Sequence, residues 1–348
     1  MKLLKYISPI VFIALIGCNN HKLDNAKPFS IQAVKTVNIQ DLIVDFNKDF
    51  YVRFGDFQLI GDYLMFNDFT PTNEKGIHIF NRSSFEYITS TGVLGRGPGE
   101  ITRLGQSVIS FCGDFFWVDD YGLEVRWKFP IDSVISNKNF LPSINKAMDS
   151  KMFLVDYELI NDSIALGIAV VPLSANAAEM TLAKYNFNTS KTERYGYEHS
   201  AINDHRQTYS SFKLDRKNDR YIRGYVNLDL MTICNLNGDL IYNICGPLIN
   251  NQNNEFNQYF QGVDIYKDLI LASYLGDKHV ILEEGQPAQM EYPSKLLTFN
   301  STGDLIKVIE TGYSFSSFCI DEVYDRVILY FEDKENPLGY FSLEGILN

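Results

Sequence analysis

The stretch that decides the fold is GDYLMF, residues 61–66, in which an aspartate in a turn precedes a short apolar strand. The same unit occurs five more times: GDFFWV (113–118), NDSIAL (161–166), NDRYIR (218–223), KDLILA (267–272) and YDRVIL (324–329). The six aspartates follow one another at intervals of 48 to 57 residues. A period near 50 residues is typical of propellers and arrays, and it leaves room for four short strands per unit.

A second element follows each aspartate unit and has the pattern strand, tight turn, strand. Clear examples are LMTICNLNGDLIYNI (230–244) and LLTFNSTGDLIKVI (296–309), whose Asn-Gly and Thr-Gly pairs favour hairpin turns. The sequence therefore predicts an all-β fold, a six-bladed propeller with four-stranded blades. The sixth unit ends at Asn348 without a fourth strand, so we expect Ile31–Ile39 to supply one and close the ring.

The N-terminus has the pattern of a secretory signal. Lys2 and Lys5 precede a short apolar run, and Leu15-Ile16-Gly17-Cys18 resembles the lipobox of bacterial lipoproteins. The resemblance implies a signal peptide at 1–17 and a lipidated Cys18, followed by a polar tether at 18–30 and one propeller domain at 31–348. Asn19 follows the cysteine where an inner-membrane retention signal would have Asp, which favours the outer membrane. The protein could be attached to either leaflet of that membrane.

Charge and cysteine usage narrow the function classes. The chain carries a net charge of −12 and has no run of basic residues, which excludes nucleic acid as an expected partner. Besides Cys18 there are four cysteines, none of them in a C-x-x-C pair: Cys112, Cys234, Cys245 and Cys319. We expect these four to be free, buried thiols.

The glycine-rich stretch GVLGRGPGE, residues 92–100, has two competing interpretations. A phosphate loop would need a following helix, or a Lys after the glycines, and the sequence shows neither. The stretch is better interpreted as the connector between blades 1 and 2, with glycines that permit positive φ. Arg96, Glu100 and Arg103 would then lie near the mouth of the channel.

The lipobox, the six units and GRGPGE together resemble the TolB-like six-bladed propeller lipoproteins, which share their architecture with NHL-type propellers. The resemblance covers roughly residues 30–348 and rests mainly on the glycine-rich motif. It implies a fold and a cell-envelope location. It implies no activity for any named residue.

Long loops mark one face of the predicted propeller as the binding face, because b–c and d–a connections share that face and are longer than the other turns. Its candidate residues are Arg96, Glu100, Arg103, Asp68, Asp119, Asp120, His199, Asp204, His205 and Arg206. The carboxylates could hold Ca²⁺ or another divalent ion through oxygen ligands. The alternative without a function is that the carboxylates form a solvated rim and that EHSAINDHR, residues 198–206, is an ordinary polar loop.

Two functions follow from these features. The first is a lipid-anchored, non-catalytic binding or scaffold protein of the cell envelope, which uses its long-loop face for a protein, peptide or glycan. The alternative is a hydrolase or lyase resembling the lactonase-type propellers, with a metal at the channel mouth held by residues such as Asp119 and His199. No G-x-S-x-G motif is present, so the sequence assigns no catalytic residue.

Overall fold

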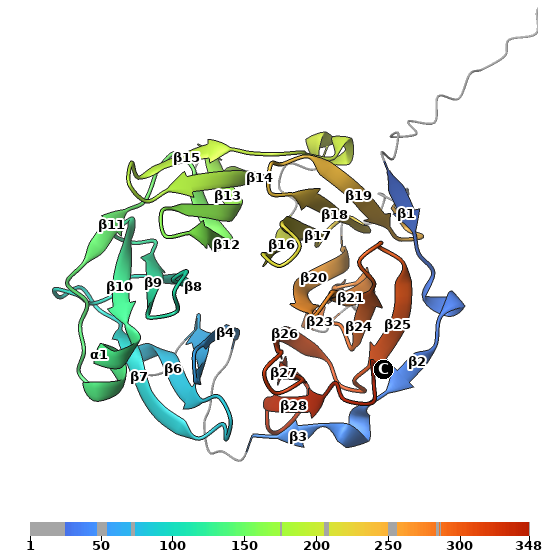
Figure 1. Ribbon diagram of the computed structural model, residues 1–348, viewed down its shortest axis with the longest axis horizontal. Coiled ribbons are helices and arrows are strands. Elements are labelled where there is room, and N and C mark those ends of the chain that lie inside the picture. Colours follow the sequence, from blue (N-terminus) through green and yellow to red (C-terminus); the bar gives the residue numbers. More distant parts are fainter. Residues whose placement is uncertain are drawn as a thin grey trace, which may run out of the picture.

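A computed structural model of the chain describes residues 25–46, 54–70, 74–174, 176–204, 209–249, 256–282, 285 and 287–347. Six sheets, each built on antiparallel blade strands, are arranged around one axis, which confirms the predicted six-bladed propeller (Figure 1). No helix in this part of the chain is long and apolar enough to span a bilayer.

Blades 1 to 3 each consist of four consecutive strands. Blade 1 contains β4 (Gly55–Ile60), β5 (Tyr63–Asp68), β6 (Lys75–Asn81) and β7 (Tyr87–Val93). Blade 2 contains β8 (Leu104–Ile109), β9 (Phe115–Asp120), β10 (Val125–Pro130) and β11 (Asn145–Ala147). Blade 3 contains β12 (Phe153–Asn161), β13 (Ile164–Ser174), β14 (Ala177–Asn186) and β15 (Lys191–Arg194).

Blades 4 to 6 also receive strands from the N-terminal segment. Blade 4 contains β16 (Ser210–Asp215), β17 (Arg220–Tyr225), β18 (Leu230–Asn235), β19 (Leu240–Cys245) and β1 (Ala26–Pro28). Blade 5 contains β20 (Asn257–Tyr266), β21 (Leu269–Lys278), β24 (Lys295–Phe299), β25 (Leu305–Glu310) and β2 (Thr36–Asn38). Blade 6 contains β26 (Phe315–Asp321), β27 (Arg326–Phe331), β28 (Leu338–Ser342) and β3 (Val44–Asp45).

The recurring aspartates stand in the turns between the first and second strands, as predicted. Asp219 and Asp325 adopt positive φ angles of 49° and 45° there. Aspartate tolerates this left-handed conformation better than most residues, which explains its use at a tight reversal.

The N-terminal segment forms a belt, residues 25–46, around the outside of blades 4, 5 and 6 (Figure 1). β1 and β2 add a parallel fifth strand to blades 4 and 5, respectively. Only β3 serves as a fourth strand: it completes blade 6, where it runs antiparallel to β28. Closure by an N-terminal strand is confirmed, but Val44–Asp45 supplies it instead of Ile31–Ile39. Within Ile31–Ile39, the strand β2 pairs with blade 5, because the belt passes that blade before it reaches blade 6. Pairing with the ring already begins at Ala26, inside the stretch 18–30 that the sequence assigns to the tether.

Blade 2 departs from the predicted tight hairpin between its third and fourth strands. The short helix α1 (Ile131–Ser136) and the segment 137–144 separate β10 from β11. Ile131 and Val134 are buried against blades 1 and 2. The prediction that every long loop lies on one face was therefore wrong for blade 2.

The core consists of hydrophobic clusters between neighbouring blades. At the seam where blade 6 meets blade 1, Phe66 stacks on Tyr330 with ring centroids 5.7 Å apart. The belt contributes Phe46, which stacks on Phe85 at 4.0 Å. Aromatic side chains thus join the first and last blades.

A buried ion-pair network crosses the same seam. Asp321 of blade 6 is fully buried and accepts hydrogen bonds from Arg82 of blade 1, from Nη2 at 2.6 Å and from Nε at 3.0 Å. Arg326 Nε donates to its other oxygen at 3.0 Å. One carboxylate therefore links two guanidinium groups that come from opposite ends of the propeller sequence.

The four described cysteines are free. Cys234, Cys245 and Cys319 are buried, as predicted, whereas Cys112 is exposed in the β8–β9 turn, where the prediction was wrong. Cys245 pairs in register with Leu230, and Cys234 with Leu240, so these two thiols lie at different positions along the hairpin.

Candidate functional site

The glycine-rich stretch is the connector between blades 1 and 2. It begins in β7 and reaches blade 2 through a parallel bridge between Leu94 and Ile101. Gly92 and Gly99 adopt positive φ angles of 71° and 76°, as the connector interpretation expects. No helix follows, so the loop lacks the feature that a phosphate site would need.

Gly95 and Gly97 have a different role from the predicted one. The Glu100 carboxylate folds back beneath the loop and accepts a hydrogen bond from the Gly97 amide at 2.7 Å. A Cβ on Gly95 would overlap Glu100 Oε2, and a Cβ on Gly97 would lie 2.9 Å from Glu100 Cδ. A larger residue at either position would therefore displace the Glu100 carboxylate from its place beneath the loop. Arg96 and Arg103 point to solvent and remain available to a ligand.

Asp68 and Asp120 end the second strands of blades 1 and 2, and both are buried. Asp68 accepts a hydrogen bond from the Thr70 amide at 2.9 Å. Asp120 accepts from the Thr102 hydroxyl at 2.6 Å and from the amides of Thr102 and Arg103 at 2.9 and 3.0 Å. Burial alone would raise the pKa of Asp120, but these hydrogen bonds lower it. Asp120 therefore stabilises the entry into blade 2.

Asp119 belongs to a buried network behind the channel wall. Its Oδ1 lies 2.8 Å from Arg126 Nε and accepts a hydrogen bond from the Tyr157 hydroxyl at 3.0 Å. The Arg126 guanidinium lies over the ring of Tyr185, 4.2 Å from its centroid. Burial raises the pKa of Asp119 to about 6, although Arg126 favours the charged form. This carboxylate is committed to an ion pair within blade 2 and to a hydrogen bond from Tyr157 of blade 3.

His199 is buried rather than displayed on a rim. Its Nδ1 accepts a hydrogen bond from the Ala201 amide at 3.2 Å, and the adjacent Glu198 pairs with Arg223 at 2.7 Å. Asp204 ends the 3₁₀ helix η3 (Ser200–Asp204), and its side chain lies outside the described part of the structure, as do His205 and Arg206.

The sequence-predicted candidates do not gather at one point. Within the described ranges, no group of three or more His, Cys, Asp and Glu side chains is placed to hold a metal ion. Asp68, Asp119 and Asp120 lie in separate hydrogen-bond networks. Their arrangement is that of residues which stabilise blade connections.

A polar cavity of about 620 Å³ occupies the channel, and the innermost strands of all six blades line it: β4, β8, β12, β16, β20 and β26. Lys213 bridges two acidic residues, with Nζ 3.2 Å from Glu158 Oε1 and 3.0 Å from Asp264 Oδ1. Burial disfavours the Lys213 charge, but these two carboxylates raise its pKa above the usual range. The cavity is partly open to solvent and contains ionised groups, and a concave site with such groups is a candidate for ligand binding.

Two further carboxylates face this cavity. Gln106 Nε2 donates to Asp56 at 3.3 Å, and the Phe212 amide donates to Asp156 at 2.8 Å. Burial, and then the charge of Asp56, raise the pKa of Asp156 to about 7. Burial also raises the pKa of Asp56.

The sequence contained a signal for this cavity. A polar residue stands six residues before the turn aspartate in four blades: Asp56, Asp156, Lys213 and Cys319. That position falls on the innermost strand and faces the channel. Single-strand patterns did not reveal the site because its six walls come from six distant segments.

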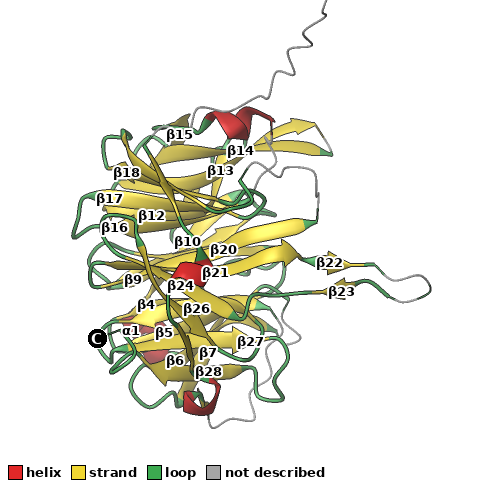
Figure 2. Ribbon diagram, turned by 90° about the vertical axis from the view of Figure 1, so that its right-hand side faces the viewer, coloured by secondary structure: helices red, strands yellow, loops and turns green. Residues whose placement is uncertain are grey.

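Exposed apolar side chains occur on both faces, among them Phe111 and Val323 in turns of the opposite face, and seven lie on connections of the long-loop face. These seven are Phe54, Leu123, Leu173, Tyr209, Phe256, Leu282 and Met290. The hairpin of β22 (Val280–Ile281) and β23 (Gln289–Met290) projects well beyond the ring (Figure 2). Next to Tyr209, a groove of about 280 Å³ is lined by residues that include Pro172 and Met180.

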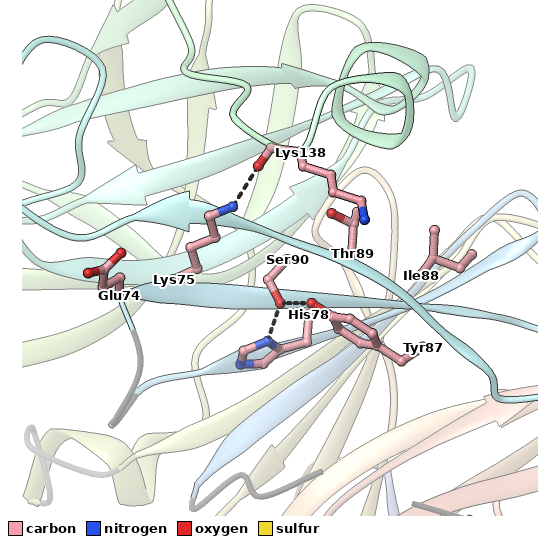
Figure 3. A pocket seen from close by; sticks show the side chains of 8 residues that line it. All are labelled: Glu74, Lys75, His78, Tyr87, Ile88, Thr89, Ser90 and Lys138. Atoms are coloured by element: carbon pink, nitrogen blue, oxygen red, sulfur yellow. Dashed lines mark hydrogen bonds between the residues drawn. The ribbon is translucent and has the colours of Figure 1, made fainter. Parts of the chain in front are cut away.

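A second pocket, of about 450 Å³, lies at the outer strands of blade 1 (Figure 3). Ser90 Oγ lies 2.8 Å from both His78 Nδ1 and the Tyr87 hydroxyl, and Lys75 Nζ donates to the Lys138 carbonyl at 2.6 Å. Burial lowers the pKa of His78 to about 4, so its ring is neutral at pH 7, and the tautomer decides whether Nδ1 donates the hydrogen bond to Ser90 or accepts it. The pocket is a polar surface site, remote from the channel.

The architecture places the chain among the six-bladed β-propellers. No family model matches it, and no curated protein does. Among solved structures it is similar to a member of the DUF4221 family from Bacteroides vulgatus, with 13% identity and a TM-score of 0.58 over 86% of this chain and 95% of that one.

Two further solved structures are similar over most of the chain. The structure of U3-55K has 8% identity and a TM-score of 0.55, covering 87% of this chain and 99% of that one. The WD40 repeats of RRP9 have 9% identity and a TM-score of 0.53, covering 86% and 96%. Identities this low show a shared fold alone. The TolB-like and NHL-like resemblance stays a prediction.

Proposed function

We propose that this chain is a lipid-anchored propeller of the bacterial cell envelope that binds a protein, peptide or glycan through its long-loop face. The observation that carries the binding role is the groove beside Tyr209, a side chain that is 65% exposed. Leu173, at the end of β13, is 57% exposed near the same groove. Clustered apolar side chains within a polar surface are typical of interaction sites.

The anchor rests on the lipobox alone, and Cys18 lies outside the described residues. Labelling cells with an alkyne fatty acid tests it directly. The wild-type chain should take up label and sediment with the outer membrane, whereas a Cys18→Ala variant should do neither. Label retained by the variant, or a soluble full-length wild-type chain, would contradict the anchor.

The binding face can be tested by site-specific photocrosslinking in intact envelopes. A photoreactive residue at position 209 should give a discrete adduct, and excess purified wild-type protein should suppress it. Val323, which is 69% exposed in the β26–β27 turn on the opposite face, is the matched control position. Equal adducts from both positions, or none from position 209, would refute a role for this face.

A catalytic propeller is less well supported. The described carboxylates that the hydrolase or lyase alternative would use, Asp68, Asp119 and Asp120, are engaged in capping hydrogen bonds and an ion pair. Such groups are held in place to stabilise the blades and are not free to move a proton or hold a substrate.

A further inference from the structure

We propose that the channel binds a small organic cation, whose protonated amine lies between Asp56 and Asp156. This inference goes beyond the proposed function, because it concerns the channel and does not depend on a partner at the long-loop face. Its basis is the channel cavity of about 620 Å³ and the distribution of charge on its wall.

The cationic side chains of the wall are already engaged. Lys213 lies between Glu158 and Asp264, and Arg216 Nη2 lies 3.5 Å from the other oxygen of Glu158 and donates to the Leu159 carbonyl at 2.8 Å. Asp264 also accepts hydrogen bonds from the amides of Ile265 and Ile320, at 2.8 and 2.7 Å. The charges of Lys213 and Arg216 are thus balanced by Glu158 and Asp264.

Asp56 and Asp156 form no ion pair with this set, although the charge of Lys213 partly offsets the rise in the pKa of both. In the described residues neither carboxylate has a basic partner within ion-pair distance, and each accepts hydrogen bonds only from neutral donors such as Gln106 and the Phe212 amide. The charge of Asp56 also raises the pKa of Asp156, so the two carboxylates repel each other across the cavity. A cation between them would remove this repulsion.

A third group on the same wall is the thiol of Cys319, which also packs in the hydrophobic cluster at the seam between blades 6 and 1. Cys319 is 8% exposed, lines the cavity, and makes no hydrogen bond to any described residue. Its nearest charged neighbours are Asp264, Asp56 and Lys213, and burial raises its thiol pKa well above the usual value. A neutral thiol is a weak acceptor, so Cys319 could accept a hydrogen bond from an ammonium group bound in this cavity.

The rest of the wall suits a compact, partly apolar ligand body. Phe57 and Phe318 line the cavity beside the polar groups, and Gln58 and Gln261 supply amides. A ligand of this chemistry is an aliphatic or sugar amine. Nucleotides and other polyanions are disfavoured, because most ionised groups on the wall are carboxylates.

Calorimetric titration of the full chain tests the proposal. The probes are 1,5-diaminopentane and glucosamine, and the neutral controls are 1,5-pentanediol and glucose. At least one amine should bind saturably while its neutral counterpart does not. Asp56→Asn and Asp156→Asn should each weaken binding about tenfold to a hundredfold, as expected for loss of a charge-assisted hydrogen bond. Asp162→Asn, at an exposed turn, is the matched control and should bind like the wild type.

A second measurement needs no variant. Because a bound cation lowers the pKa of Asp156 from about 7, binding at pH 7 should release a fraction of a proton. Titrations in buffers of different ionisation enthalpy would detect this release. The proposal is overturned if neither amine binds, if the two variants bind as tightly as the wild type, or if binding takes up protons.

Discussion

Replacing Asp321 with alanine should strongly destabilise the propeller. The carboxylate is fully buried and receives hydrogen bonds from Arg82 and Arg326, whose side chains are only 15% and 7% exposed. Its removal leaves two guanidinium groups without their counter-charge in a site that water barely reaches. Breaking a buried pair of this kind destabilises by about 3–5 kcal/mol. For a chain of this length, about 2 °C per kcal/mol predicts a fall in Tm of about 6–10 °C.

Differential scanning calorimetry at matched pH measures this effect. The control is Asp268→Ala, which breaks the solvent-exposed pair with Lys217 and should leave Tm almost unchanged. A double-mutant cycle of Asp321→Ala with Arg82→Met isolates the coupling across the seam. If Asp321→Ala melts no lower than the control, or if the cycle shows no coupling, the network does not hold the first and last blades together.

Three further outcomes are expected. Gly95→Ala should destabilise by about 1 kcal/mol in urea unfolding, because its Cβ displaces the Glu100 carboxylate and breaks the hydrogen bond from the Gly97 amide. In a Glu100→Ala background the same substitution should cost less, and an equal cost in both backgrounds would contradict the packing argument. The pKa of Asp156 in the folded protein lies at about 7, above the ordinary 3.8. The free energy of unfolding of the wild type, relative to that of Asp156→Asn, should therefore fall as the pH rises from about 4 to 7. A difference that does not change with pH would contradict the raised pKa. A chain that begins at residue 54 lacks the belt and leaves the outer edges of blades 4, 5 and 6 unpaired. It should therefore have a lower Tm and self-associate in size-exclusion chromatography. A monomer with an unchanged Tm would show that the belt is dispensable.

The blade repeat was predictable because its cause is local. Asp219 stands in a turn that requires a left-handed residue, and the strands on both sides follow from short apolar runs bounded by polar residues. Six repetitions of one local pattern, at a nearly constant period, define a propeller without knowledge of any long-range contact.

The closing strand was less predictable because pairing is not local. Ile31–Ile39 has the composition of a strand, and Thr36–Asn38 does form one, on blade 5. Which edge it meets depends on the path of the belt, which the sequence of the segment does not contain. Blade 2 shows the same limit, since α1 replaces the expected hairpin where Ile131 and Val134 find an apolar surface on blade 1.

The candidate site was predictable only in part. The sequence pointed to Glu100, Asp119 and Asp120 because charged residues beside glycines or at strand ends are conspicuous. It did not show that these carboxylates would be engaged by backbone amides and by Arg126. Asp56 and Asp156 looked like ordinary strand residues, and their importance arises only where distant strands meet.

The belt also determines the order in which the chain can finish folding. Its first contact joins Asn25 to Ile241, 216 residues away, and its last joins Phe46 to Asn336, 290 residues away. Contacts that close such long loops form late, after local hairpins have assembled. Each part of the belt can pair only after its own blade has been made: β1 needs blade 4, β2 needs blade 5 and β3 needs blade 6. A product truncated within blade 6 would leave β3 without an edge to join.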